Sequence, residues 1–174
     1  MSLLTWSEEL HVQHPRMDAT HQEFVEHLQT VEAAVQAAAV TAQAAGSAVT
    51  PAGAVATLLG AYDALIEHTV GHFEQEDRWM LATGFTADNC HSNQHRQVLG
   101  VLREVRRIAA EENKPEIIGQ LLPELTQWFT NHAQAADAGL AGHLNEIGFD
   151  TETGQVANAP AEAISGCGSN SCGH

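Results

Sequence analysis

The stretch HFEQEDRWMLATGFTADNCHSNQH, residues 72–95, contains the end of one predicted helix, a short connection and the start of the next helix. Apolar residues recur at helical spacing before it, from Val55 to Met80, and Gly84 lies just past the end of that helix. The next helix is expected to begin near residue 86 or 88 and to end near Asn113. A connection this short makes the two helices antiparallel neighbours.

Two more helices flank this pair in the sequence. The first is expected over about residues 18–45, and its alanine-rich second half has high helix propensity. Thr50-Pro51 is typical of a helix start, an N-cap followed by proline at the first helical position. The last helix is expected over about 115–144, with a kink or a later start at Pro123. The sequence therefore predicts an all-α fold, an up-down-up-down antiparallel four-helix bundle.

Both ends of the chain lie outside the predicted helices. Trp6, Leu10 and Val12 suffice to pack an extended N-terminal arm against the bundle, but not to form a domain. The last part of the chain is small, polar and glycine-rich, so it cannot bury enough apolar area to offset the entropy of ordering. We expect one bundle over residues 1–147 and a flexible Gly/Ala-rich tail over 148–174.

Charge and composition argue against several classes of protein. The 22 acidic residues outnumber 7 Lys+Arg, giving a formal net charge of −15. Proteins that bind nucleic acids or anionic membranes need clustered lysine and arginine, so we expect neither partner. Glu8 and Glu9 stand where a signal peptide would be positively charged, and the sequence contains no apolar run long enough to span a membrane. We expect a cytoplasmic protein.

The 11 histidines are the unusual feature, because imidazole is the commonest side-chain metal ligand. Two pairs of potential ligands stand at i,i+4 spacing on different predicted helices, so each pair shares one helix face. The two remaining helices carry further ligands, and the depth along each helix places all of them within one end of the bundle. The seven potential ligands are His21, His72, Glu76, His91, His95, His132 and Asp137.

Five imidazoles and two carboxylates exceed what one zinc ion takes, since zinc sites usually have four ligands. They suit two ions bridged by carboxylates in the core of a bundle. Imidazole-rich ligation without thiolate favours iron, with copper, nickel or zinc behind it. Asp137 stands at i,i+5 from His132, about 140° around an ideal helix, so we expect a local π-bulge to bring the two side chains closer.

The ordered set of motifs resembles the bacterial hemerythrins, four-helix oxygen-binding proteins with a non-haem di-iron centre. The resemblance covers about residues 6–140. It is carried by Trp6, Asp18-x-x-His21, His72-Phe73-x-x-Glu76, His91-x-x-x-His95 and Trp128-x-x-x-His132-x-x-x-x-Asp137.

The resemblance implies how the ligands divide between two irons. His91, His95 and His132 would hold one iron, while His21 and His72 would hold the other. The carboxylates of Glu76 and Asp137, together with a solvent-derived oxo or hydroxo group, would bridge the two. That count leaves the second iron with an open position for dioxygen.

The pocket around that open position is expected to have mainly apolar walls. Phe24 and Trp128 each stand one turn from a histidine ligand, with Phe129 beside Trp128. Ala135 stands where members of the family often carry a larger aliphatic residue, so the pocket is expected to be roomier or wetter here. We expect these four residues to line the oxygen pocket.

The function that the resemblance implies is reversible dioxygen binding for storage, delivery to an oxygen-using enzyme, or scavenging, and we expect no catalysis beyond a side activity on peroxide or nitric oxide. The alternatives are a di-iron enzyme acting on peroxide or nitric oxide, with Tyr62 or His68 as the nearest acids, or an oxygen or iron sensor. His68 is also a possible partner that orients His72. In the tail, Cys167, Cys172 and His174 suit a soft metal site or a reversible disulfide, although a tail without metal is the simpler interpretation.

Overall fold

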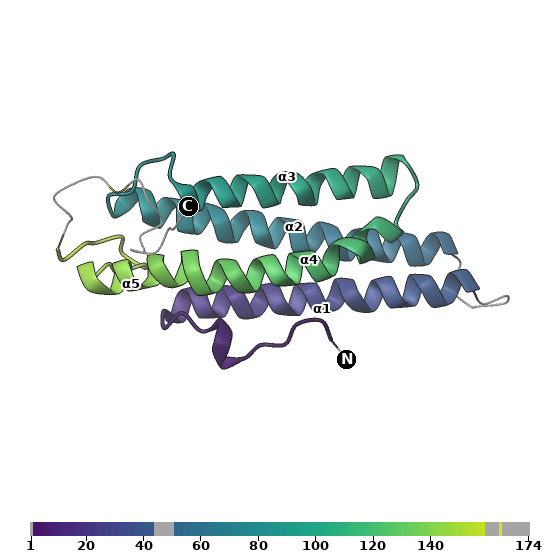
Figure 1. Cartoon of the computed structure of the whole chain (residues 1–174), viewed down its shortest axis with the longest axis horizontal. Coiled ribbons are helices and arrows are strands. Elements are labelled where there is room, and N and C mark those ends of the chain that lie inside the picture. The colour runs from purple at the N-terminus through teal and green to yellow at the C-terminus, as the bar shows by residue number, and fades with distance from the viewer. Residues whose placement is uncertain (1, 44–50, 159–163, 165–174) are drawn as a thin grey trace.

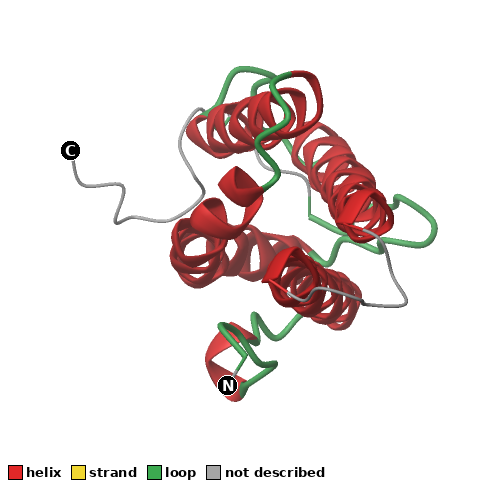
Figure 2. Ribbon diagram, turned by 90° about the vertical axis from the view of Figure 1, so that its right-hand side faces the viewer, coloured by secondary structure: helices red, strands yellow, loops and turns green. Residues whose placement is uncertain are grey.

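The computed structural model describes residues 2–43, 51–158 and 164. Four long helices lie antiparallel along one axis: α1 (Pro15–Gln43), α2 (Pro51–Ala82), α3 (Cys90–Glu111) and α4 (Glu116–His132) (Figure 1). The view along that axis shows them grouped around a common centre (Figure 2). The expected all-α up-down-up-down bundle is confirmed. Within the described residues, no helix has the length and apolar character needed to cross a membrane.

Local sequence signals set where the helices begin and end. Gly84 adopts a φ of 97° in the turn after α2, a left-handed conformation that favours glycine. The side chain of Asn89 caps α3 by accepting a hydrogen bond from the Ser92 backbone N–H at 2.9 Å. Pro123 lies within α4 and does not end that helix.

The last predicted helix is present as three consecutive helical segments, of which α4 is the first. Residues Ala133–Asp137 form a π-helix, η2, which leads directly into α5 (Ala138–Ile147). Its hydrogen bonding is seen at Ala138, whose backbone N–H donates to the carbonyl of Ala133, five residues back. The π-bulge expected beside His132 is therefore present. Gly148 ends α5 in a left-handed conformation, with a φ of 62°.

Two apolar clusters stabilise the bundle. The larger one fills the space between α1, α2, α3 and α4 and includes Phe24, Tyr62, Leu102 and Phe129. The smaller one lies at the end where α2 finishes and α5 ends, and it contains residues such as Trp79, Phe85 and Leu144. The N-terminal arm contributes to both clusters. Its 3-10 helix η1 (Glu8–Leu10) buries Leu10 in the larger cluster, and Val12 joins the smaller one.

Part of the expected tail contacts this smaller cluster. Phe149 and Ile164 pack against it, and Ile164 forms an isolated parallel bridge with Phe85. The Ile164 N–H donates to the Gly84 carbonyl at 2.8 Å, and its carbonyl accepts from the Thr86 N–H at 2.8 Å. These contacts are not predicted from the sequence. Cys167, Cys172 and His174, for which a metal site or a disulfide was considered, lie outside the described residues.

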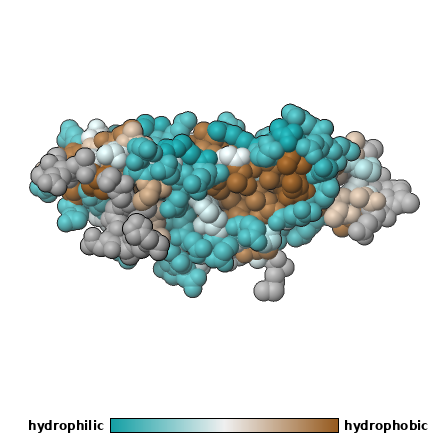
Figure 3. Space-filling model, turned by 45° about the horizontal axis from the view of Figure 1, so that its top comes forward, coloured by the Kyte–Doolittle hydropathy of each residue, from teal (hydrophilic) through white to brown (hydrophobic). Residues whose placement is uncertain are grey.

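One face of the bundle carries exposed apolar surface. A groove of about 240 Å³ lies between α3 and α4, lined by residues that include Val101, Leu121 and Trp128. Val101 is 47% exposed. Apolar side chains gather on the face shown in brown in Figure 3.

Candidate metal centre

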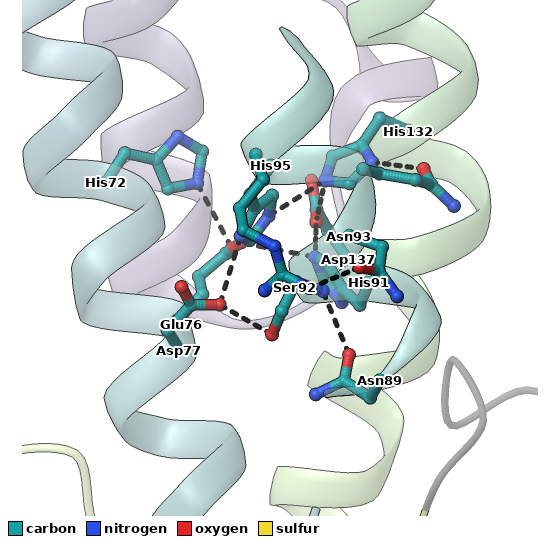
Figure 4. Close-up of polar contacts among 12 residues, drawn as sticks. His72, Glu76, Asp77, Asn89, His91, Ser92, Asn93, His95, His132 and Asp137 are labelled. Atoms are coloured by element: carbon teal, nitrogen blue, oxygen red, sulfur yellow. Dashed lines mark hydrogen bonds and ion pairs between the residues drawn. The ribbon is translucent and has the colours of Figure 1, made fainter. Parts of the chain in front are cut away.

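All seven potential ligands lie close together near one end of the bundle, and they come from α1, α2, α3, α4 and η2. Figure 4 labels all of them except His21. They form two adjoining groups, and the ligand atoms within each group lie within 4.8 Å of one another. All seven residues are buried. The three-histidine group is His91, His95, His132, Glu76 and Asp137, and the two-histidine group is His21, His72, Glu76 and Asp137.

The two carboxylates are shared between the groups, and each points one oxygen at each group. Glu76 Oε1 lies 3.1 Å from His72 Nε2, while its Oε2 lies 3.3 Å from His95 Nε2. Asp137 Oδ2 lies 3.1 Å from His21 Nε2, while its Oδ1 lies 3.0 Å from His91 Nε2. This is the arrangement needed for two carboxylates to bridge two cations.

Several of these buried atoms lack a hydrogen-bond partner although they lie close to one another. They include the Nε2 atoms of His21 and His91, Oε2 of Glu76 and both carboxylate oxygens of Asp137. The short N···O distances among them are not in hydrogen-bond alignment. Buried polar atoms without partners are costly, so converging lone pairs of this kind indicate a site for cations.

Charge in the metal-free site is balanced by protons on imidazole rings. Burial opposes the charged form of His91, but contacts with Asp137 and Glu76 outweigh it and raise the pKa of His91 to about 10. Burial and the charge of Asp137 oppose ionisation of Glu76, yet the neighbouring His72 and His91 hold the pKa of Glu76 well below its ordinary value. Cations bound between these groups would take the place of the imidazole protons.

Two of the histidines have polar partners on their outer side. Asp77 Oδ1 lies 3.2 Å from His95 Nδ1 and also accepts a hydrogen bond from the Ser92 hydroxyl at 2.9 Å. Gln94 Oε1 lies 2.8 Å from His132 Nδ1. Such contacts fix the orientation of a ring and leave its Nε2 directed at the ions. Sequence reasoning missed Asp77 and Gln94, although each stands next to an expected ligand in the chain.

An aromatic pair lies beside the two-histidine group. The rings of Phe24 and Phe129 stack with centroids 4.2 Å apart, and Phe129 meets His21 edge-on at 5.4 Å. Both phenylalanines are 1% exposed, so they form a dry wall on this side. This is the side on which the resemblance placed the open position.

Trp128 occupies a different place from the one expected. Its ring stacks on His132 with centroids 4.5 Å apart and meets Phe73 at 6.1 Å. Phe73 in turn stacks on His95 at 3.8 Å. Trp128 therefore covers a ligand of the three-histidine group, because its position one turn before His132 brings the two rings together on the same helix face.

The expectation that Ala135 lines the pocket is wrong, because its side chain is exposed. Ala136 is buried instead, with 2% exposure. The expectation assumed ordinary α-helical rotation after His132. The π-helix winds more residues into this turn, so Asp137 returns to the face of His132 and Ala135 is turned outward.

Tyr62 and His68, which the sequence offered as acids, and Cys90, which adjoins His91, have partners outside the ligand set. The Tyr62 hydroxyl donates to the Leu102 carbonyl at 3.2 Å, and burial raises the pKa of Tyr62. His68 Nε2 lies 3.1 Å from the Thr20 carbonyl, so it donates there and does not orient His72. Cys90 is disulfide-bonded.

The donor set and its geometry fit two metal ions. Five imidazole nitrogens with two bridging carboxylates, and with no thiolate among them, favour iron. The three-histidine group offers more ligands than the two-histidine group, so the two positions are chemically unequal.

Comparison with known proteins agrees with this geometry. The chain matches the hemerythrin HHE cation binding domain over residues 13–144. It is 34% identical over 150 residues to a bacteriohemerythrin of Ralstonia nicotianae, covering 86% of this chain and 95% of that protein. It is 25% identical over 162 residues to a bacteriohemerythrin of Stenotrophomonas maltophilia, covering 88% and 92% of the two chains. The chain belongs to the hemerythrin family.

Proposed function

We propose that this protein binds dioxygen reversibly at a centre of two iron ions. The observation that carries the proposal is the unequal ligand set around two shared carboxylates. Three histidines complete one group, whereas the other has two histidines and the same carboxylates. A pair of iron ions there would supply the electrons and the open coordination position that reversible dioxygen binding requires. Membership of the hemerythrin family supports this function, and so does the similarity to bacteriohemerythrins of two bacteria.

The chain's own residues would hold the ions and keep water away. Glu76 and Asp137 each direct one oxygen at each histidine group, so they would hold the two ions together. The buried pair Phe24 and Phe129 excludes solvent beside His21. A dry apolar wall on the open side favours release of dioxygen unchanged, because protons from water would allow it to leave as peroxide with electrons taken from the two ions.

Two side chains considered as acids for an enzyme are engaged elsewhere. The Tyr62 hydroxyl donates to a backbone carbonyl, and its raised pKa makes it a poor acid. The N–H of His68 is directed at the Thr20 carbonyl. These contacts support binding over chemistry on peroxide or nitric oxide. Storage, delivery to an oxygen-using enzyme and scavenging all use the same site.

The test combines metal analysis with absorption spectra. We expect two irons per chain, and a spectrum of the reduced protein that changes on exposure to air and returns under argon. His72→Ala removes one of two imidazoles from its position and should lower the iron content toward one or none per chain. His143→Ala is the matched control, because His143 lies outside both groups.

Two results would contradict the proposal. Full iron occupancy in His72→Ala would show that the ligand assignment is wrong. A reduced protein that consumes peroxide or nitric oxide catalytically, with no spectrum that reverses under argon, would favour an enzyme instead.

A further inference from the structure

A pocket on the outer side of α1 and α2 contains a second, separate set of histidine and carboxylate side chains. Its volume is about 420 Å³, and its lining includes Glu23 and His27 from α1 and His68 from α2. The His27 and His68 rings lie with centroids 5.0 Å apart. Glu23 Oε2 lies 3.7 Å from His68 Nδ1. None of these three residues belongs to the two inner groups, and their ligand atoms do not all lie within 4.8 Å of one another, so the side chains must rotate for all three to reach one ion.

The hydrogen bond of His68 determines which of its nitrogens can bind an ion. A carbonyl oxygen only accepts, so the 3.1 Å contact with the Thr20 carbonyl requires the proton on His68 Nε2. In the neutral ring the lone pair then resides on Nδ1, the atom that faces Glu23. An imidazole lone pair and a carboxylate oxygen directed at one another are two acceptors, which attract a shared cation.

The setting of these side chains suits a reversibly bound ion. The His68 side chain is 11% exposed and so is held in place, whereas the Glu23 side chain is 63% exposed and can adjust. The pocket also contains Arg16 and Glu67, one charge of each sign, so Glu23 gives it a net negative charge. Imidazole with carboxylate is a donor set for divalent first-row transition metals.

The pocket is also adjacent to the inner centre. His72, a member of the two-histidine group, forms part of the pocket wall. The rings of His68 and His72 lie with centroids 6.2 Å apart, and those of His72 and His21 lie 5.2 Å apart. An ion held at His68 is therefore on the solvent side of the two-histidine group, separated from it by one ring.

We propose that Glu23, His27 and His68 bind a divalent transition-metal ion, and that this outer site loads iron into the two-histidine group. The binding itself does not depend on the proposed function, whereas the loading role rests on it. Half-exposed ligands would leave water on the ion, which makes binding weaker and exchange faster than in the buried centre.

Zinc binding to untagged, iron-loaded protein tests the outer site directly. His68→Gln keeps a donor for the Thr20 carbonyl but removes the Nδ1 lone pair, so it should weaken zinc binding by about tenfold or more. The matched control is His143→Gln, because His143 also directs its Nε2 at a helix carbonyl, that of Thr83, at 3.0 Å. Zinc affinity in this control should equal that of the parent.

A second pair of variants guards against an effect of misfolding. Glu23→Gln changes a mostly exposed side chain and should also weaken zinc binding. Glu26→Gln removes the same charge three residues further along α1 and should leave the zinc affinity unchanged. Equal zinc affinity in the parent, His68→Gln and Glu23→Gln would overturn the site. Equal weakening by Glu23→Gln and Glu26→Gln would also overturn it, since general charge would then explain the binding.

Iron uptake by the metal-free protein tests the loading role. We expect His68→Gln to take up ferrous iron more slowly than the parent but to reach the same final content. An unchanged rate, or a lower final content, would overturn the loading role. A parent protein that takes up no iron would contradict the proposed function, while the zinc comparison would still test the outer site.

Discussion

Asp77 illustrates how a single side chain outside the ligand set can affect the centre. Its carboxylate lies 3.2 Å from His95 Nδ1 and is itself held by the Ser92 hydroxyl. These contacts lower the pKa of Asp77 despite its partial burial, so the carboxylate is charged at neutral pH. A carboxylate beside the outer Nδ1 of His95 makes its inner Nε2 a stronger metal ligand.

Replacing Asp77 should therefore weaken iron binding without removing a ligand. We expect Asp77→Ala to lower iron affinity by about tenfold to a hundredfold, the range typical of lost outer partners. The measurement is iron transfer to a competing chelator. Asp63→Ala, which removes a carboxylate paired with Arg106 at the surface, should leave the affinity unchanged. Equal chelator curves for Asp77→Ala and the parent would contradict the orienting role.

The protons of the buried histidines should make the metal-free protein sensitive to alkali. The pKa of His91 is about 10, raised from 6.5, so its proton stabilises the folded state fully below pH 6.5. That contribution is lost as the pH rises toward 10, because the unfolded chain has already lost the proton. We expect the free energy of unfolding by urea to fall between these pH values without iron.

The two buried carboxylates should make the metal-free protein sensitive to acid as well. Glu76 and Asp137 have pKa values well below the ordinary values of 4.5 and 3.8, so their stabilising contribution is lost as the pH falls. Iron-loaded protein is the control for the alkaline range, since bound metal replaces the His91 proton. An alkaline loss that is equal with and without iron would show that His91 is not its cause.

At the scale of elements, the π-helix η2 positions the last carboxylate. In an ordinary α-helix, residues five apart lie about 140° apart around the axis, which would direct Asp137 away from the face of His132. The wider turn brings Asp137 Oδ1 to 3.1 Å from His132 Nε2. The π-helix also buries Ala136 and leaves Ala135 exposed.

A matched pair of substitutions tests this turn. Ala136→Leu inserts a larger side chain into a buried position and should lower the free energy of unfolding by about 1–3 kcal/mol. Ala135→Leu is made at an exposed position and should change it by no more than about 0.5 kcal/mol. Urea unfolding of both metal-free variants provides the comparison. The reverse order would indicate an ordinary α-helical turn.

At the scale of the molecule, the metal centre lies between two apolar clusters. The larger cluster fills the rest of the bundle, and the smaller one closes the end nearest the centre. Phe149 and Ile164 extend the smaller cluster beyond the end of α5. The two inner groups contain no residue that follows Asp137 in the described chain. Part of the apolar stabilisation therefore comes from residues that follow the last ligand in the chain.

Truncation after Ile147 should separate stability from metal binding. In reducing buffer, where the disulfide of Cys90 does not contribute, the loss of two half-buried apolar side chains should lower the free energy of unfolding by about 1–3 kcal/mol, while the iron content stays at two per chain. Truncation after Asn158 keeps Phe149 and should cost less. Urea unfolding measures the stability of both truncated proteins, and metal analysis measures their iron content. Loss of iron on truncation would show that the end of the chain supports the centre.

The sequence by itself determined the helices and the positions of the ligands along them. The predicted ranges agree with the structure to within a few residues, as for the first helix, expected over 18–45 and found over Pro15–Gln43. Helix formation depends on local spacing, caps and glycine or proline signals, all of which are readable along the chain. Spacing also shows which residues share a face and how deep they lie, and so it predicted which seven residues would meet.

Only the tertiary structure decided how these residues meet. It determined that each carboxylate directs one oxygen to each group, that Asp77 and Gln94 hold two of the rings, and that Trp128 covers His132. It also turned Ala135 outward. The physical reason is that contacts between helices depend on their rotation and separation. The packing of the whole core determines the rotation and the separation of the helices, and the spacing of residues along one helix specifies neither quantity.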